Sequence, residues 1–321
     1  MRSSFLAIAL LPAFAFLRGQ QTPPHDSPMA KFMATEANST APGPTVIPLY
    51  DGPIPNSKAV ADEEDSIRPG VVQKVSKPTI EVFLPAKSKG NGSAIIIFPG
   101  GGYTSLWILD QGEKVAEEFQ DHGYAAFVVK YRLPIDRIME NKSVGPLQDA
   151  EQSILLVRKH AAEWKINPAR IGVIGFSAGG HLASTLGTHF GKSYIANPDR
   201  VSLRPDFMIL VYPVISMDSK IAEMGSRNAL LGEHPDQADV RLFSNETQVT
   251  DETPPALILH AADDHIVDVD NSILFFEALR RHEIPVRMVI FEKGDHGLFP
   301  LPRDDWQAII FKWLDDNHWS R

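Results

Sequence analysis

The sequence predicts an α/β fold in which a mostly parallel central sheet is flanked by helices. Short, fully apolar segments such as residues 94–98 and 125–129 alternate along the chain with longer segments whose apolar residues recur at helical spacing. Strands that are apolar throughout are typical of parallel sheets covered by helices on both faces. In addition, a Gly-x-Ser-x-Gly pentapeptide lies between one of these apolar strands and a helical segment.

The composition is typical of a globular protein and excludes several classes of site. The 321 residues suffice for one large domain preceded by a leader, and hydrophobic residues make up 43% of the chain. The net charge of −9, with no basic stripe, argues against nucleic acid as a partner. The absence of cysteine excludes disulfides, thiolate metal sites and cysteine nucleophiles.

The N-terminal residues resemble a secretory signal peptide. Residues 1–4 carry one positive charge, and residues 5–17 form a nearly unbroken apolar run. A bilayer span needs about 20 apolar residues, so this run has the length of a signal-peptide core instead. We expect residues 1–19 to be a signal peptide, cleaved after Ala15 or nearer Gly19. The protein is then secreted or periplasmic, without stable membrane association after cleavage; an uncleaved membrane anchor is the alternative.

The rest of the chain divides into a linker and a folded domain. Residues 20–45 predict a flexible linker, because they are rich in Pro, Ser, Thr and Ala and lack periodicity. In residues 46–321 we expect regular structure to begin near Thr79. The expected strands lie at residues 79–84, 94–98, 125–129, 171–175, 207–212, 256–260 and 286–290. The expected helices lie at residues 113–120, 147–164, 178–188, 271–281 and 304–317. The polar residues 216–254 predict a small inserted cap of short helices.

The pentapeptide Gly175–Gly179 predicts a nucleophilic serine. It follows the apolar strand at residues 171–175 and opens the helix at 178–188, which is the strand–turn–helix context of a nucleophile elbow in the α/β-hydrolase fold. The glycines permit the close backbone approach that such a sharp turn requires. The turn raises Ser177 above the sheet at a helix N-terminus, where the field favours a developing anion. We therefore assign residues 46–321 to an α/β-hydrolase catalytic domain.

A glycine-rich loop predicts the oxyanion hole. Residues 99–103, Pro-Gly-Gly-Gly-Tyr, directly follow the strand at 94–98, where many esterases carry such a loop. The backbone N–H groups of Gly101, Gly102 and Ala178 are expected to point at one substrate oxygen. A donor of this kind stabilises the tetrahedral intermediate of acyl transfer by about 3 kcal/mol.

The general base is expected to be His296. The chain has eleven histidines, and His296 lies in Gly-Asp-His-Gly just after the strand at 286–290, where catalytic groups collect. His181, on the helix after the serine, and His260, at the end of a buried strand, are expected to have structural roles.

The acid is expected between the serine and the histidine, after the strand at 256–260. Asp264 opens an Asp-x-x-Val turn and is favoured. Asp263 is the main alternative, although its side chain could instead stabilise the turn. Asp268 and Asp270 lie in the same region.

Taken together, these segments resemble bacterial acetyl esterases of the type described as acetyl xylan esterase or bifunctional feruloyl and acetyl esterase. The resemblance rests on residues 99–103, 125–133, 146–150, 175–182, 264–267 and 294–297. It extends from about Ile47 to near the C-terminus. The chain departs from the family pattern at Gln111, where relatives usually carry Glu, and at His265, where many carry Pro.

The resemblance implies deacetylation of plant or microbial polysaccharide by Ser177, His296 and Asp264, whereas the residues alone predict acyl-ester hydrolysis. A feruloyl esterase is one alternative. A serine peptidase of the oligopeptidase kind is another, although the sequence shows no β-propeller domain. A non-catalytic binding protein is a third, although such proteins usually lack the serine or the histidine.

The aromatic residues after the glycine-rich loop are candidates for substrate binding. Tyr103 and Trp107, with Leu106, are placed to wall off a small acyl pocket, and ordinary packing is the alternative. Acetylated carbohydrate is the expected partner, and neither a cofactor nor a metal ion is expected.

Overall fold

The structure is a computed structural model that describes residues 45–86, 89–298 and 301–320. The expected signal peptide at residues 1–19 and nearly all of the expected linker at residues 20–45 lie outside the described residues. No helix in the described part is long and apolar enough to cross a membrane.

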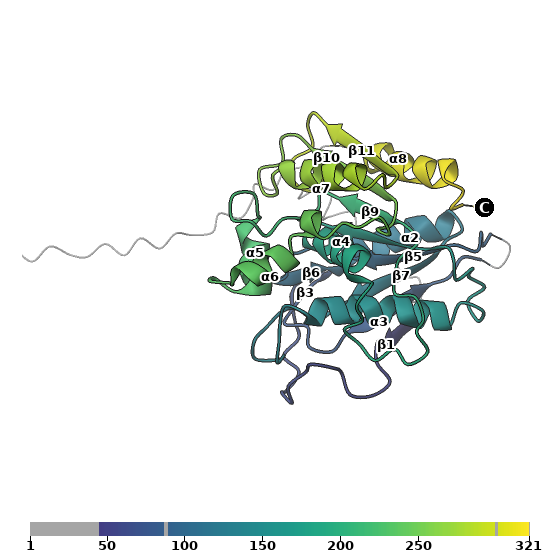
Figure 1. Cartoon of the computed structure of the whole chain (residues 1–321). Helices are drawn as coiled ribbons and strands as arrows, with labels where there is room; N and C mark the ends of the chain where they lie inside the picture. The colour runs from purple at the N-terminus through teal and green to yellow at the C-terminus, as the bar shows by residue number, and fades with distance from the viewer. Residues whose placement is uncertain (1–44, 87–88, 299–300, 321) are drawn as a thin grey trace, which may run out of the picture. The chain divides into compact units, whose positions relative to one another are not determined.

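An eight-stranded, mostly parallel sheet forms the centre of the domain (Figure 1). Only the pairs β1–β4 and β4–β7 are antiparallel. Across the sheet the order is β1 (Thr45–Pro48), β4 (Thr79–Phe83), β7 (Ala125–Lys130), β5 (Ala94–Phe98), β8 (Ile171–Phe176), β9 (Met208–Val211), β10 (Ala256–Ala261) and β11 (Val286–Phe291). The predicted fold class, a mostly parallel sheet flanked by helices, is confirmed.

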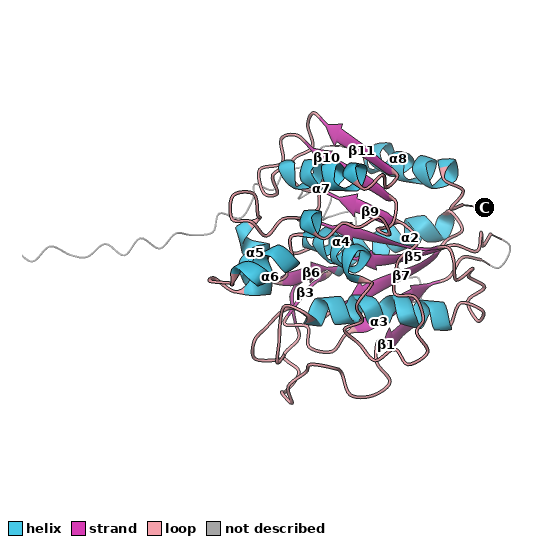
Figure 2. Ribbon diagram, in the orientation of Figure 1, coloured by secondary structure: helices cyan, strands magenta, loops and turns pink. Residues whose placement is uncertain are grey.

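Helices cover the sheet on both faces, as Figure 2 shows. The view places α3 (Gly145–Lys159), α4 (Ala178–His189) and α7 (Asp270–Arg281) on the near side of the strands and α2 (Lys114–Asp121) behind them. The helix α8 (Arg303–Asp316) packs against α2, since the rings of Phe119 and Phe311 lie 5.1 Å apart.

The core explains why the central strands were recognisable. Every position of β5, β8, β9 and β10 is buried, so these strands consist almost entirely of apolar residues. Each buried Val, Ile or Leu side chain contributes about 1.5–3 kcal/mol relative to exposure. The seven predicted ranges match the observed strands to within one residue at every end.

The expectation that regular structure begins near Thr79 is wrong. β1 precedes it, and a second, antiparallel sheet consists of β2 (Asp65–Arg68), β3 (Val71–Gln73) and β6 (Ser105–Trp107). These strands are only three or four residues long, which is too short for a recognisable apolar run, and β2 is mostly exposed. The pairing of β3 with β6 joins segments that are distant in sequence, which periodicity does not reveal.

The expected end of the helix at residues 147–164 is also wrong, because α3 ends at Lys159 rather than at Trp164. The Trp164 side chain continues the apolar pattern from a following turn. Its ring lies 4.8 Å from that of Phe127 and stacks on His160 at 5.2 Å. Because Trp164 is partly buried at a position that continues the helical spacing, the sequence predicted one more turn of helix than α3 has.

The expected cap is present within residues 216–254. It contains α5 (Met224–Leu231), α6 (Gln237–Leu242) and a 3₁₀ turn, Asn245–Thr247. Carboxylate side chains at the N-caps fix both helices: Glu223 accepts hydrogen bonds from Gly225 and Ser226, and Asp236 accepts one from Asp239. Figure 1 shows α5 and α6 next to each other beyond the ends of the strands.

A buried glutamate in α3 makes stability depend on pH. One Glu151 carboxylate oxygen accepts the Tyr194 N–H at 2.7 Å, whereas the other has no partner among the described residues. Burial raises the pKa of Glu151 from 4.5 to about 7. Because the folded state holds this proton more tightly, the associated stability is complete below the unfolded pKa and is lost as the pH rises through about 7.

We predict that Glu151→Gln is more stable than the wild type above neutral pH, by on the order of 1 kcal/mol. The difference should shrink as the pH falls toward 5, because the wild-type side chain then becomes neutral too. Denaturant unfolding across this pH range measures it, with the exposed Glu140→Gln as a matched control. A stability difference that is constant with pH would contradict the prediction.

Candidate active site

Ser177 lies at the sharp turn between β8 and α4, in a backbone conformation that L-residues rarely adopt, with φ of 53°. Such strain costs of order 1–3 kcal/mol and persists only where packing enforces it. Both flanking glycines lack room for a side chain. A Cβ at Gly175 would lie 2.1 Å from the Gly179 carbonyl oxygen, and a Cβ at Gly179 would lie 2.1 Å from that of Phe98. Close packing therefore requires the Gly-x-Ser-x-Gly pattern here.

A chain of hydrogen bonds joins three loops at the carboxyl ends of the strands. His296 Nε2 lies 3.0 Å from Ser177 Oγ, and His296 Nδ1 lies 2.8 Å from Asp264 Oδ2. Asp264 is fully buried, whereas 17% of the His296 side chain is exposed. The carboxylate accepts the proton on Nδ1, which leaves Nε2 free to accept the hydroxyl proton of Ser177. This arrangement can generate an oxygen nucleophile.

The environment of Asp264 keeps this buried side chain ionised. Its Oδ1 accepts the backbone N–H groups of Ile266 and Val267, both at 2.9 Å. Burial raises the pKa of Asp264, but hydrogen bonds from His260, His296 and Val267 and the charge of His296 outweigh this effect. The pKa of Asp264 therefore lies well below its ordinary value.

Asp263, the other candidate, faces a different group. Its Oδ1 accepts the backbone N–H groups of Gly294 and Asp295, each at 2.9 Å, in the loop that carries His296. These hydrogen bonds, that from Asp295 first, lower the pKa of Asp263. The structure thus brings Asp264 to the imidazole of His296, and it brings Asp263 to the backbone beside that histidine.

The glycine-rich loop runs beside the nucleophile. A Cβ on Gly100 would lie 3.1 Å from the Cβ of Ser177. Gly101 and Gly102 have φ of 134° and 62°, and the Gly101 carbonyl accepts the N–H groups of residues 104 and 105. As the first residue of α4, Ala178 has an N–H without an acceptor inside the helix. The expected oxyanion-hole residues are therefore close to Ser177, and their catalytic role stays a prediction.

Gln111 is a residue of the site that sequence reasoning noted only as a departure from the family pattern. It lies in a π-helical turn, Leu109–Glu113, and its Oε1 accepts the Gly100 N–H at 2.7 Å. That N–H is therefore occupied, so the candidate donors for a substrate are those of Gly101 and Gly102. Gly112 fits this turn against the sheet, since a Cβ there would lie 2.7 Å from Val128.

The three residues expected to line an acyl pocket lie at different depths. Tyr103 is only 2% exposed, and its hydroxyl hydrogen-bonds His181 Nδ1 at 2.8 Å. Leu106 is fully buried. Trp107, on β6, is partly exposed, and the guanidinium of Arg68 lies 4.1 Å from its ring centroid. Tyr103 thus supports the loop from below, and Trp107 is the member of the set that reaches the surface.

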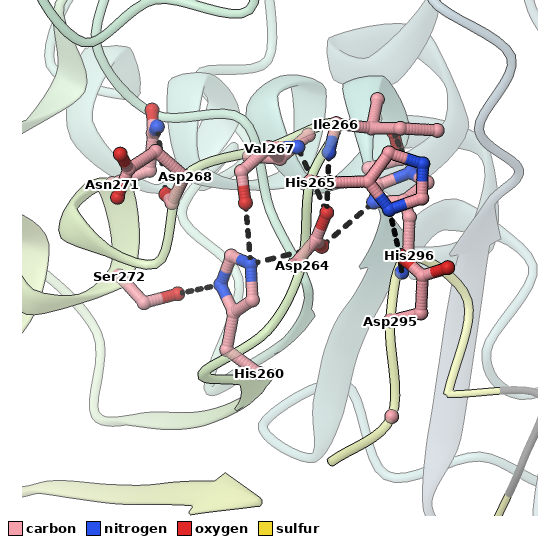
Figure 3. A network of polar contacts seen from close by, with 12 residues as sticks. His260, Asp264, His265, Ile266, Val267, Asp268, Asn271, Ser272, Asp295 and His296 are labelled. Carbon is pink, nitrogen blue, oxygen red and sulfur yellow. Dashed lines mark hydrogen bonds and ion pairs between the residues drawn. The ribbon is translucent and has the colours of Figure 1, made fainter. Parts of the chain in front are cut away.

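Both histidines assigned structural roles are fully buried. His181 Nε2 donates to the Phe243 carbonyl at 2.8 Å, and burial lowers the pKa of His181 to about 4. His260 contacts Asp264, as Figure 3 shows, with Nε2 at 3.1 Å from Oδ2. The position of His260 at a strand end predicted its burial, but nothing in the spacing revealed its contact with this carboxylate.

Comparisons with known proteins identify relatives that act on esters and xylan. Residues 80–279 match the family model BD-FAE. The chain is 38% identical over 226 residues to the acetylxylan esterase of Xylanibacter ruminicola, covering 69% of this chain and 44% of that protein. It is 37% identical over 206 residues to the endo-1,4-beta-xylanase B of Butyrivibrio fibrisolvens, covering 64% of this chain and 32% of that protein. The chain thus matches less than half the length of either relative.

One solved structure matches this chain over nearly the whole length of the solved chain. The acetyl ester-xyloside bifunctional hydrolase from Caldicellulosiruptor lactoaceticus is 37% identical, with a TM-score of 0.72. The match covers 88% of this chain and 99% of that one. The domain therefore has the same fold as that hydrolase.

The geometry predicts different consequences for the two neighbouring aspartates. Asp264→Asn should slow labelling of Ser177 by a fluorophosphonate by up to roughly 10⁴-fold, because the amide no longer holds the Nδ1–H tautomer of His296. Asp263→Asn is the matched control and should have a small effect, since its remaining oxygen can still accept both backbone N–H groups. Labelling rates followed by intact mass measure both. The reverse ranking would place Asp263 as the partner of His296.

Proposed function

The chain belongs to the BD-FAE family, and from this we propose that it is a serine esterase that removes acetyl groups from carbohydrate. It has the α/β-hydrolase fold of its relatives and is, like them, a carboxylic ester hydrolase. The observation that carries the proposal is the hydrogen-bonded chain Ser177–His296–Asp264 beside the glycine-rich loop. Xylan or a related polysaccharide or oligosaccharide is the proposed substrate.

The proposed reaction passes through an acyl-enzyme. Ser177 Oγ attacks the ester carbonyl while His296 Nε2 takes the hydroxyl proton, and the carbonyl oxygen becomes an oxyanion held by backbone N–H groups of Gly101, Gly102 and Ala178. Collapse of this intermediate breaks the bond to the alcohol, which leaves with the proton from His296. Water then attacks the acyl group in the same way and releases the acid and free Ser177.

Three features support a short acyl group on a sugar as the substrate. The names of the relatives include an acetylxylan esterase and an acetyl ester-xyloside hydrolase. The cap, residues 216–254, lacks the long apolar run of a lipase lid. It also lies close to the loop, because the position of a Cβ on Gly102 is 3.9 Å from the Ser226 hydroxyl of α5. A helix this near leaves little depth for a long acyl chain.

The remaining parts of the proposal concern the organisation of the chain. We propose that residues 1–19 are a signal peptide, residues 20–45 a linker and residues 46–321 the catalytic domain. The support is the positive start, the apolar run and the Pro-rich composition that follows it. The protein would then act outside the cytoplasm, where polymeric xylan is found.

Replacing the nucleophile tests the mechanism. Ser177→Ala should lower kcat for p-nitrophenyl acetate by on the order of 10⁶-fold, because among the described residues the Ser177 hydroxyl is the group hydrogen-bonded to His296 Nε2. Thermal unfolding should show an intact fold, and a fluorophosphonate should label the wild type at Ser177 alone. Wild-type activity in this variant would exclude the proposed mechanism.

The acyl preference tests the proposed substrate. We expect kcat/KM to fall steeply from p-nitrophenyl acetate to octanoate and acetate to be released from acetylated xylan. Each added methylene must either find apolar contact, worth about 0.8 kcal/mol, or clash with the cap.

Chelators should leave these rates unchanged. Among the residues that the structure describes, no group of three or more side chains is arranged to hold a metal ion.

Feruloyl esters are the informative comparison for the acyl preference, since an open rim could stack their ring. Faster cleavage of octanoate than of acetate, or cleavage of peptides but not of acetylated sugars, would overturn this substrate assignment.

A further inference from the structure

A second histidine contacts the Asp264 carboxylate from a different side than His296 (Figure 3). His260, at the end of β10, is fully buried and takes no part in the acyl-transfer steps described above. Its ring makes three polar contacts, drawn in Figure 3: Nδ1 to Ser272 Oγ at 2.7 Å, Nε2 to the Val267 carbonyl at 3.0 Å, and Nε2 to Asp264 Oδ2 at 3.1 Å.

These contacts assign the proton positions of His260. Nε2 faces a carbonyl oxygen and a carboxylate oxygen, both of which only accept hydrogen bonds, so Nε2 carries a proton. Nδ1 can then accept the hydroxyl proton of Ser272. Nε2 therefore donates one N–H that is shared between Asp264 and Val267.

The carboxylate of Asp264 is thereby held at both of its oxygens. Oδ1 accepts two backbone N–H groups, from Ile266 and Val267. Oδ2 accepts one N–H from His296 and one from His260. Two imidazoles, one from the end of β10 and one from the loop after β11, thus share a single oxygen, with the carboxylate between them (Figure 3).

The contact with Asp264 is not required to satisfy the buried ring. Ser272 and the Val267 carbonyl alone give each nitrogen of His260 a partner. The third contact adds a donor to the carboxylate that faces His296. A rotation of that carboxylate would break the hydrogen bonds at both oxygens together.

We propose that His260 is a positioning residue of the reaction, which fixes the rotation of the Asp264 carboxylate and draws charge away from the oxygen that His296 uses. The proposal rests on the serine esterase mechanism above and assigns His260 no contact with substrate. Without its N–H, Asp264 can turn, and Oδ2 interacts with His296 alone. The orientation of the imidazole toward Ser177 then becomes less exact, and misplacement of this kind slows chemistry rather than binding.

Two polar substitutions separate this role from packing. In His260→Gln the side-chain amide nitrogen reaches the position of Nε2 and can still donate to Asp264. In His260→Asn the amide reaches only the position of Nδ1, near Ser272, and the donor to Asp264 is lost. Both variants place an amide in the same buried space, so they are matched for polarity.

We expect His260→Asn to lower kcat for p-nitrophenyl acetate by about 10- to 100-fold with little change in KM. His260→Gln should retain most of the wild-type kcat. Equal losses in the two variants, or no loss in either, would overturn the proposal. Thermal unfolding of both variants shows whether the comparison is made between folded proteins.

Proton NMR gives a readout that loss of packing would not imitate. In His260→Asn the His296 Nδ1–H resonance should move downfield, because Oδ2 has lost its competing donor and binds this proton more strongly. In His260→Gln the resonance should stay near its wild-type position. Broadening or loss of the signal in both variants would indicate a structural role and contradict the proposal.

The proton position on His260 can also be measured in the wild-type protein, so this test does not depend on the folding of a variant. Nitrogen-15 spectra of the wild type should show His260 protonated at Nε2, and a ring protonated only at Nδ1 would overturn the proposal. The proposed function fails separately, through an active Ser177→Ala variant or a wild type that cleaves no ester.

Discussion

The fully buried carboxylate of Asp264 is the constraint on which the site depends. A charge without solvent is tolerated in a protein only when hydrogen bonds compensate its desolvation. The four donors come from the turn after β10, from the end of β10 itself and from the loop after β11. Because each donor has a fixed direction, satisfying this one charge also fixes the relative positions of His260 and His296.

The nucleophile end of the site is fixed by contact rather than by charge. Gly179 packs against the Phe98 carbonyl, at the point where β5 gives way to the glycine-rich loop. The positions of the strained turn at Ser177 and of the loop beside it are therefore both fixed by the sheet. Gln111 adds a hydrogen bond to Gly100 from the π-helical turn. Ser177 and the candidate oxyanion donors are thus positioned by the same buried strands that form the core.

Features that depend on residues close together in the chain could be predicted from the sequence, whereas features that depend on distant residues could not. The elbow around Ser177 and the loop at Gly101 could be located because each directly follows a strand of apolar residues. Short strands such as β2 and β6 could not, since three or four residues are too few to show a period and the partner of β6 is distant in sequence. The sequence narrowed the acid to a few aspartates, with Asp264 preferred on a turn motif. Only the three-dimensional arrangement distinguishes its contacts from those of Asp263.

The surplus of donors at Asp264 has an electrostatic cost. Each hydrogen bond to the carboxylate lowers its pKa and weakens its attraction for the imidazolium that forms when His296 takes the serine proton. A carboxylate with fewer donors would attract that cation more strongly but could rotate in its cavity. An acid whose task is to orient an imidazole gains more from a fixed direction than from maximal charge. The sharing of Oδ2 between two histidines therefore favours geometry over field strength, in a site where the turn at Ser177 is already rigid.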